Sequence, residues 1–212
     1  MVHMDIVLDL GLVIIVILLS MVLHEFMHGL TAYWLGDNTA KINGRLSFNP
    51  IKHIDPFLSL LLPLILAVSG GPIFGGAKPV PINPNNLRWR EWGMALVAIA
   101  GPLTNFILAF IFFTLLAIFQ PSGIMMDFLL LGFQINMGFC IFNLLPIPPL
   151  DGSRILYAIA PDVVRRIMVS MECYGLIIVF VAIFLLGGVF GQFMTTGISA
   201  TFDFFISLFG LS

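Results

Sequence analysis

Several apolar runs in this 212-residue chain are long enough to cross a membrane as helices. The hydrocarbon core of a bilayer is about 30 Å thick, so a spanning helix needs about 20 apolar residues. Runs of this kind cover residues 8–35, 92–119, 125–145 and 174–190, with a shorter run at 56–68 and a weaker one at 193–211. The pattern predicts an all-α, polytopic membrane protein with five or six membrane segments.

Composition supports this class and excludes others. Hydrophobic residues make up 59% of the chain and charged residues 9%, whereas soluble domains carry about 25% charged residues. The net charge is −2 and no basic run resembles those that bind phosphate backbones, so we expect no nucleic acid partner. The N-terminus lacks the basic region and small-residue cleavage site of a signal peptide. We therefore interpret the first apolar run as a retained span in the lipid bilayer.

Residues 69–87, between the second and third runs, are too rich in Gly, Pro and Asn for a helix. Irregular backbone at membrane depth must be covered by protein or line a wet cavity, and we expect a loop or an extended hairpin here. The chain shows no internal repeat and no insertion long enough to fold alone. We expect residues 1–212 to form one membrane domain.

The nine Lys and Arg residues fall into three clusters, at residues 41–52, 78–90 and 154–166. By the positive-inside rule, the N-terminus lies outside and the first cluster lies in the cytoplasm. The second cluster is also cytoplasmic if the 56–68 run dips into the membrane and returns, whereas a full span would place it outside. We expect the dip because this run is short and contains Pro63.

The sequence HEFMH at residues 24–28 matches the pattern H-E-x-x-H. On a helix, His24 and His28 project from one face and can hold one zinc ion, while Glu25 can activate a water molecule. The alternative is a polar patch at the membrane surface. About 21 Å of helix separates Leu10 from His24, however, and ionisable groups at that depth are costly unless they coordinate something. The pattern therefore favours a zinc site.

A catalytic zinc ion takes three protein ligands and keeps a fourth position open, so another ligand is required. Asp151 is a candidate because the prolines between residues 146 and 149 prevent a regular helix, which lets its carboxylate reach a neighbouring helix. The alternative is that Asp151 caps the helix that follows it. Membrane interfaces or helix starts better explain the other candidates, Glu91, Glu172 and Asp127.

Further motifs accompany HEFMH: NPIKHIDP at 49–56, GGAKPVPINP at 75–84, AGPLTN at 100–105 and NLLPIPPLDG at 143–152. Together they resemble the site-2 protease family of intramembrane zinc metalloproteases. Ser153 stands where much of that family has Gly, a departure that removes no ligand. The resemblance suggests the compact branch of the family, in which we expect no peptide-recognition or nucleotide-sensing module.

The resemblance also implies roles for particular residues. His24, His28 and Asp151 would ligate one Zn²⁺ per chain, and Glu25 would be the catalytic base.

Three more residues are candidates for binding substrate or shaping the site. Asn143, which we expect in the extended run before Asp151, and Asn105 match family positions, and the resemblance suggests these roles for them. His53 lies in NPIKHIDP, where it could make a structural hydrogen bond, contact the substrate or the active site, or belong to a second metal site.

The expected function is that of an intramembrane zinc metalloendopeptidase, a multi-pass protein of a prokaryotic cell membrane. It would cleave transmembrane segments of other proteins near the cytoplasmic side, in regulated intramembrane proteolysis. One alternative is a metal transporter, because intramembrane His and carboxylate groups also mark ion pathways. Another is a catalytically silent scaffold that binds membrane helices. The convergence of the ionisable groups on one site, with Glu25 placed as a base, favours the protease.

Overall fold

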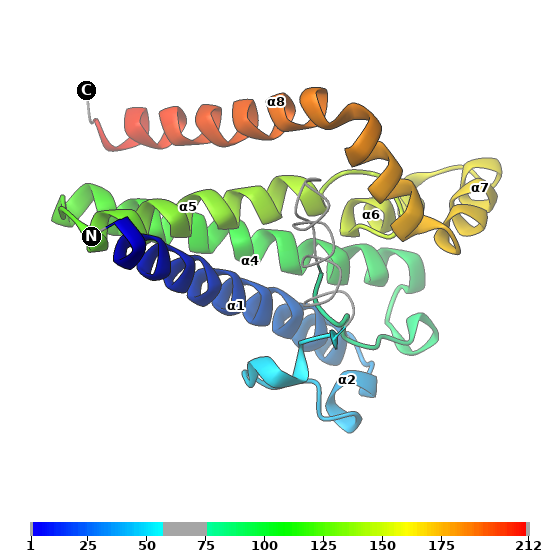
Figure 1. The fold of residues 1–212 in the computed structure, drawn as a ribbon. Coiled ribbons are helices and arrows are strands. Elements are labelled where there is room, and N and C mark those ends of the chain that lie inside the picture. The colour runs from blue at the N-terminus through cyan, green and yellow to red at the C-terminus, as the bar shows by residue number, and fades with distance from the viewer. Residues whose placement is uncertain (1, 57–75, 211–212) are drawn as a thin grey trace.

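The computed structural model of the chain describes residues 2–56 and 76–210 (Figure 1). All regular secondary structure within these ranges is helical. The α-helices are α1 (Val2–Trp34), α2 (Thr39–Ile42), α4 (Arg90–Phe119), α5 (Ile124–Asn143), α6 (Asp151–Ile159), α7 (Asp162–Glu172) and α8 (Gly175–Phe209), and the 3-10 helices are η1 (Pro50–Lys52) and η3 (Pro84–Asn86). The predicted all-α class is confirmed for this part of the chain.

Four of these helices, α1, α4, α5 and α8, are long and apolar enough to cross a membrane. In the most apolar stretch of each, no more than 33% of the residues are buried inside the protein. Many of their large apolar side chains are exposed, as expected for helices whose surroundings are lipid rather than water.

Residues 174–190 and 193–211 were expected to form two segments. Helix α8 consists of two helical stretches that meet at a kink at Leu186, whose dihedral angles, φ −113° and ψ 18°, are not helical. The break therefore lies inside the first predicted segment, before the predicted boundary near residue 191. The described residues thus contain four candidate spans, and the predicted count of five or six is not confirmed. The predicted dip at 56–68 lies outside the described residues from residue 57 onward.

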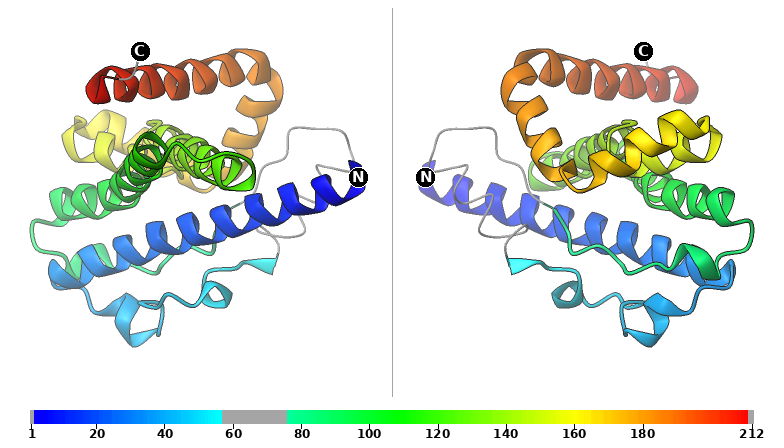
Figure 2. Two further views of the ribbon diagram at one scale, coloured as in Figure 1. Left: turned by 90° about the vertical axis from the view of Figure 1, so that its left-hand side faces the viewer. Right: turned by 90° about the vertical axis from the view of Figure 1, so that its right-hand side faces the viewer.

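Helices α4 and α5 form the centre of the bundle, with α1 on one side and α8 on the other (Figure 2). A cluster rich in phenylalanine fills the space between α4, α5 and α8, with Ala109, Phe112, Phe113, Leu129, Phe133, Met137 and Phe205 at its centre. The short helices α6 and α7 lie at the end of the bundle opposite both chain termini (Figure 1). This end carries the candidate site.

The second basic cluster lies beside the first. The backbone N–H of Lys78 donates to the carbonyl of His53 at 2.9 Å, and that of Arg88 donates to the carbonyl of Leu35 at 2.8 Å. These bonds hold residues 76–90 against the end of α1 and the segment that follows it. Helices α6 and α7, which carry the third basic cluster, lie at the same end of the bundle (Figure 1).

Candidate metal centre

The two histidines of HEFMH lie on the buried face of α1. Buried residues recur every four positions along this face, at Val16, Ser20, His24, His28 and Ala32. Because residues four apart share one face of a helix, this stripe packs against α4 and α5. The Nε2 atoms of His24 and His28 lie 2.9 Å apart. Both imidazoles therefore direct one nitrogen at the same point.

Asp151, the first residue of α6, faces these two nitrogens. Its Oδ2 lies 3.2 Å from Nε2 of His24 and 3.3 Å from Nε2 of His28. The N-cap position of α6 is Leu150, so Asp151 does not cap its helix as the alternative interpretation required. Gly152 allows this placement, because a Cβ there would lie 2.5 Å from the carbonyl oxygen of Leu145. Only glycine lets the chain after α5 fold back over the start of α6.

The other nitrogen of each histidine contacts α4. Nδ1 of His24 lies 2.6 Å from Oδ1 of Asn105, and Nδ1 of His28 lies 2.7 Å from the carbonyl oxygen of Val97. A carbonyl oxygen can only accept, so Nδ1 is the donor in both pairs. In neutral imidazoles each Nε2 then carries a lone pair and no proton.

This arrangement fits a metal ion. Two lone-pair nitrogens and a carboxylate oxygen repel one another unless a cation lies between them, and Oδ2 of Asp151 is buried without a hydrogen-bond partner in the described protein. One atom from each of His24, His28 and Asp151 lies within 4.8 Å of the other two. Two imidazoles and a carboxylate form a ligand set that zinc accepts, and hydrogen bonds from the outer nitrogens hold the rings in place.

Gly101 on α4 leaves room for this cluster. A Cβ at this position would lie 2.6 Å from Nε2 of His24 and closer still to Nε2 of His28. Val97, Gly101 and Asn105 are spaced four apart, so one face of α4 supplies an acceptor for each histidine and an open position between them. The AGPLTN motif thus contributes to the site through a missing side chain as well as through Asn105.

Glu25 is buried beside the histidines, with 8% of its surface exposed. Its Oε2 accepts a 2.9 Å hydrogen bond from the backbone N–H of Val80. The carboxylate is therefore held by the Gly/Pro-rich segment, whose residues 76–83 have no regular secondary structure. A carboxylate in this position can accept a proton from a group bound near the histidines.

Two buried residues anchor this segment on either side of Val80. On one side, His53 accepts from Lys78 through its carbonyl, and its Nε2 lies 2.8 Å from the carbonyl oxygen of Ser47. On the other side, Oδ2 of Asp37 accepts from the backbone N–H of Asn83 at 2.7 Å. These anchors fix the position of the amide that contacts Glu25.

The remaining sequence candidates have different outcomes. Asn105 contacts His24 directly, whereas His53 is not among the described residues that could share a metal with His24 and His28. Asn143 was expected in an extended run, but it is the last residue of α5, and its Nδ2 donates to the carbonyl of Phe139 at 3.0 Å. The extended assignment of Asn143 was wrong, because the prolines that end the helix begin three residues later.

Sequence reasoning missed several contributors to the site. Val97 and Val80 act through backbone atoms, which leave no signal in the sequence. Asn136 is fully buried on α5 and belongs to none of the motifs identified in the sequence. A polar residue inside an apolar run is nevertheless a signal of function.

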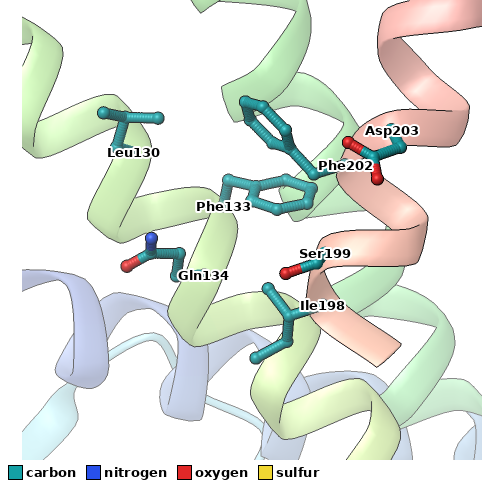
Figure 3. A pocket seen from close by; sticks show the side chains of 7 residues that line it. All are labelled: Leu130, Phe133, Gln134, Ile198, Ser199, Phe202 and Asp203. Atoms are coloured by element: carbon teal, nitrogen blue, oxygen red, sulfur yellow. The ribbon is translucent and has the colours of Figure 1, made fainter. Parts of the chain in front are cut away.

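A separate pocket of about 190 Å³ opens between α5 and α8. Figure 3 shows its lining, in which polar and apolar side chains of the two helices face each other: Leu130, Phe133, Gln134, Ile198, Ser199, Phe202 and Asp203. None of these residues belongs to the His24, His28 and Asp151 cluster, so the pocket is distinct from the candidate metal centre.

Four apolar helices and a buried cluster of two histidines and an aspartate define an α-helical membrane protein with a candidate metal centre. The chain belongs to peptidase family M50, the site-2 protease family, whose model matches residues 12–126 and 120–187. The resemblance found in the motifs is confirmed, and the chain is a metallopeptidase of this family.

Curated relatives support the same assignment. The chain is 41% identical over 174 residues to a Bacillus subtilis protein named "Putative zinc metalloprotease YwhC", covering 78% of this chain and 76% of the relative. It is 34% identical over 178 residues to "Putative zinc metalloprotease Rip2" of Mycolicibacterium smegmatis, covering 81% and 67%. A Methanocaldococcus jannaschii relative, "Putative zinc metalloprotease MJ0611", is 42% identical over 97 residues, covering 46% and 50%. No solved structure matches the chain.

Proposed function

We propose that this chain is an intramembrane zinc metalloendopeptidase that cleaves transmembrane segments of other membrane proteins. The observation that carries the proposal is the convergence of His24 and His28 on α1 with Asp151 on α6, whose ligand atoms lie within 4.8 Å of one another although the two helices are far apart in the sequence. We assign these residues as the ligands of one Zn²⁺ per chain. The assignment is supported by the chain's membership of peptidase family M50 and by relatives that are named as zinc metalloproteases.

A zinc ion in this position would supply Lewis-acid chemistry, polarising a carbonyl group and making water acidic enough to lose a proton near neutral pH. Glu25 is the proposed base that takes this proton and later passes it to the leaving amine. Its buried carboxylate has one oxygen fixed by Val80, which keeps its side chain beside the histidines. Asn105 and the carbonyl of Val97 hold the two imidazole rings with Nε2 directed inward.

The proposed substrate is a transmembrane helix that unwinds locally, because the carbonyls of an intact helix are shielded by their own hydrogen bonds. Residues 76–83 lie beside Glu25 and are irregular, so they can pair with an unwound substrate as an added strand. Asn143 is proposed to bind the substrate backbone. The side chain of Asn143 is half-buried, and its Oδ1 accepts no hydrogen bond from the residues that the structure describes.

The proposed orientation places the N-terminus outside and the site towards the cytoplasm of a prokaryotic cell. The segments that carry the nine Lys and Arg residues gather at the site end of the bundle, which the positive-inside rule assigns to the cytoplasm. Substrates should therefore be cut nearer their cytoplasmic side. A cleavage site mapped by mass spectrometry to the outer half of a substrate helix would contradict this orientation.

One experiment tests the proposed function. Purified wild-type protein and a Glu25→Gln variant are compared for bound zinc and for cleavage of a transmembrane peptide in detergent micelles. We expect about one zinc per chain in both proteins, with cleavage by the wild type alone.

The other outcomes point to the rival functions. Bound zinc with no cleavage of any transmembrane peptide by the wild type supports a silent scaffold. Zinc flux into proteoliposomes that survives the Glu25→Gln change supports a transporter. Equal cleavage by both proteins would remove Glu25 from the mechanism.

A further inference from the structure

A chain of three hydrogen bonds connects His24 to the backbone of α5, two helices away. Nδ1 of His24 lies 2.6 Å from Oδ1 of Asn105 on α4. Nδ2 of Asn105 donates to Oδ1 of Asn136 on α5 at 2.9 Å, and Nδ2 of Asn136 donates to the carbonyl oxygen of Gly132 at 2.8 Å. Both asparagines are fully buried, with 0% of their surface exposed.

The carbonyl of Gly132, at the far end of this series, determines which group donates and which accepts in each of the three hydrogen bonds. The carbonyl oxygen of Gly132 can only accept, so Asn136 must present its Nδ2 group there and its Oδ1 to Asn105. Asn105 must then direct Nδ2 at Asn136, which leaves its Oδ1 facing His24. Because that oxygen also only accepts, the proton of a neutral His24 is on Nδ1 and the lone pair is on Nε2.

The opposite orientation would disable the site. If the amide of Asn105 were reversed, its Nδ2 group would face Nδ1 of His24, and a neutral imidazole would then carry its proton on Nε2. A protonated Nε2 cannot bind a metal ion. Asn105 alone does not prevent this reversal, because the oxygen and nitrogen of its amide occupy nearly the same space and could exchange places without a clash.

We propose that Asn136 is a positioning residue of the metal centre, which acts through Asn105 to hold His24 in the tautomer that can ligate zinc. This inference rests on the proposed function, in which His24 is a zinc ligand. Asn136 is not one of the three proposed ligands, and its side chain bonds to Asn105 and to the carbonyl of Gly132. Its effect should therefore appear in metal affinity and in the tautomer of His24.

The first test is the zinc affinity of the purified full-length protein, measured in detergent by competition with a chromophoric chelator. Asn136→Leu removes both hydrogen bonds at similar volume, and Asn136→Ala is a second variant that avoids any clash of the leucine. We expect each to bind zinc about 10-fold more weakly than the wild type, the lower end of the effect of residues that support metal ligands. Circular dichroism confirms that each variant is folded.

Gln134→Leu is the matched control. Gln134 is an amide on the same helix, two residues away, but it lines the pocket towards α8 (Figure 3) and takes no part in the chain. Its affinity for zinc should stay within about twofold of the wild type. A similar loss in this control would mean that any amide on α5 has the effect and would overturn the proposal.

A double-mutant cycle separates positioning from general packing. In an Asn105→Leu background the series of hydrogen bonds between His24 and Asn136 is already interrupted. Adding Asn136→Leu should therefore change the zinc affinity by less than about twofold. A merely structural role for Asn136 would instead weaken binding by the same factor in both backgrounds. That additive result, or unchanged affinity in the single Asn136 variants, would overturn the proposal.

A measurement on the wild type does not depend on the folding of any variant. In metal-free protein labelled with ¹⁵N-histidine, the chemical shifts of His24 should report a proton on Nδ1, and a proton on Nε2 would contradict the inference. His24→Ala tests the proposed zinc ligand set separately from the proposed role of Asn136. If it leaves zinc binding intact, the proposed ligand set fails, whereas normal zinc binding by the Asn136 variants alone would refute only the role of Asn136.

Discussion

Oε2 of Glu25 accepts a 2.9 Å hydrogen bond from the backbone N–H of Val80, which joins the HEFMH helix to the Gly/Pro-rich segment. Val80 stands between Pro79 and Pro81, so this N–H is the one donor in a run of three residues. The segment can therefore hold the carboxylate at Val80 and nowhere else among these three.

Val80→Pro tests whether this hydrogen bond matters for catalysis. Position 80 precedes Pro81 and therefore favours an extended backbone, a conformation that proline can adopt, while proline lacks the N–H. We expect zinc content to be unchanged and the rate of peptide cleavage to fall by about 10-fold or more, because the base is no longer held. Val80→Ala keeps the N–H and trims the buried side chain, and it should retain most of the activity. If the two variants were equally impaired, packing rather than the hydrogen bond would explain the loss.

Gly101→Ala should damage the metal centre directly. The added Cβ would lie 2.6 Å from Nε2 of His24, well inside van der Waals contact, so the imidazoles must move apart. We expect zinc affinity to fall by about 10-fold or more, measured by chelator competition. Gly138→Ala on α5 is the control, since among the described residues its Cβ would have only Ile198 within 4 Å. Full zinc binding by Gly101→Ala would show that the site is more open than described.

Removal of the metal should also lower stability. A ligand that binds only the folded protein stabilises it by about 2.7 kcal/mol when its free concentration is 100 times its dissociation constant. We expect the thermal midpoint of the wild type to drop when zinc is chelated and to recover when zinc is restored. In a His24→Ala, His28→Ala double variant, the chelator should leave the midpoint unchanged. A shift of the same size there would place the stabilising metal elsewhere.

Asp37 should make stability depend on pH in the acid range. Burial alone would raise the pKa of Asp37, but hydrogen bonds from Thr39, Asn86 and Asn83 outweigh burial and hold the pKa below its usual value. The folded state therefore binds a proton less readily than the unfolded state does. The stabilisation is complete above the unfolded pKa of about 4 and is lost as the pH falls through the lower folded value.

The corresponding variant is Asp37→Asn, measured in the metal-free protein so that loss of zinc does not contribute. We expect it to lose about 2 kcal/mol at neutral pH, the size of a hydrogen bond to a charged group. The difference between wild type and variant should shrink as the pH is lowered below about 4. A difference that stays constant down to acid pH would show that Asp37 is not ionised in the folded protein.

Asn143→Ala tests the proposed contact with substrate. Because Asn143 lies outside the cluster of His24, His28 and Asp151, zinc content should not change. We expect cleavage of a transmembrane peptide to be about 10-fold slower, since one substrate hydrogen bond to a polar side chain is lost. Unchanged turnover would end the proposal that this side chain binds substrate.

Much of the fold could be predicted because membrane helices have a simple signature. A backbone in lipid must satisfy its own hydrogen bonds, so runs of about 20 apolar residues leave few alternatives to a helix. The bounds of α4 and α5 follow the predicted runs closely. The position of the kink in α8 could not be predicted, because it lies at Leu186, inside the apolar run predicted for residues 174–190.

The candidate site likewise has a part that the sequence could predict and a part that it could not. The sequence by itself determined that His24 and His28 share a helix face with Glu25 beside them, because the spacing of residues on a helix is fixed by its geometry. It could only nominate Asp151, since a distance between helices depends on how they pack. The tertiary structure decided that Asp151 reaches the histidines, that Gly101 leaves space for them, and that Asn136 and Val80 support the site. These are contacts between residues distant in sequence, and many run through backbone atoms that every residue possesses.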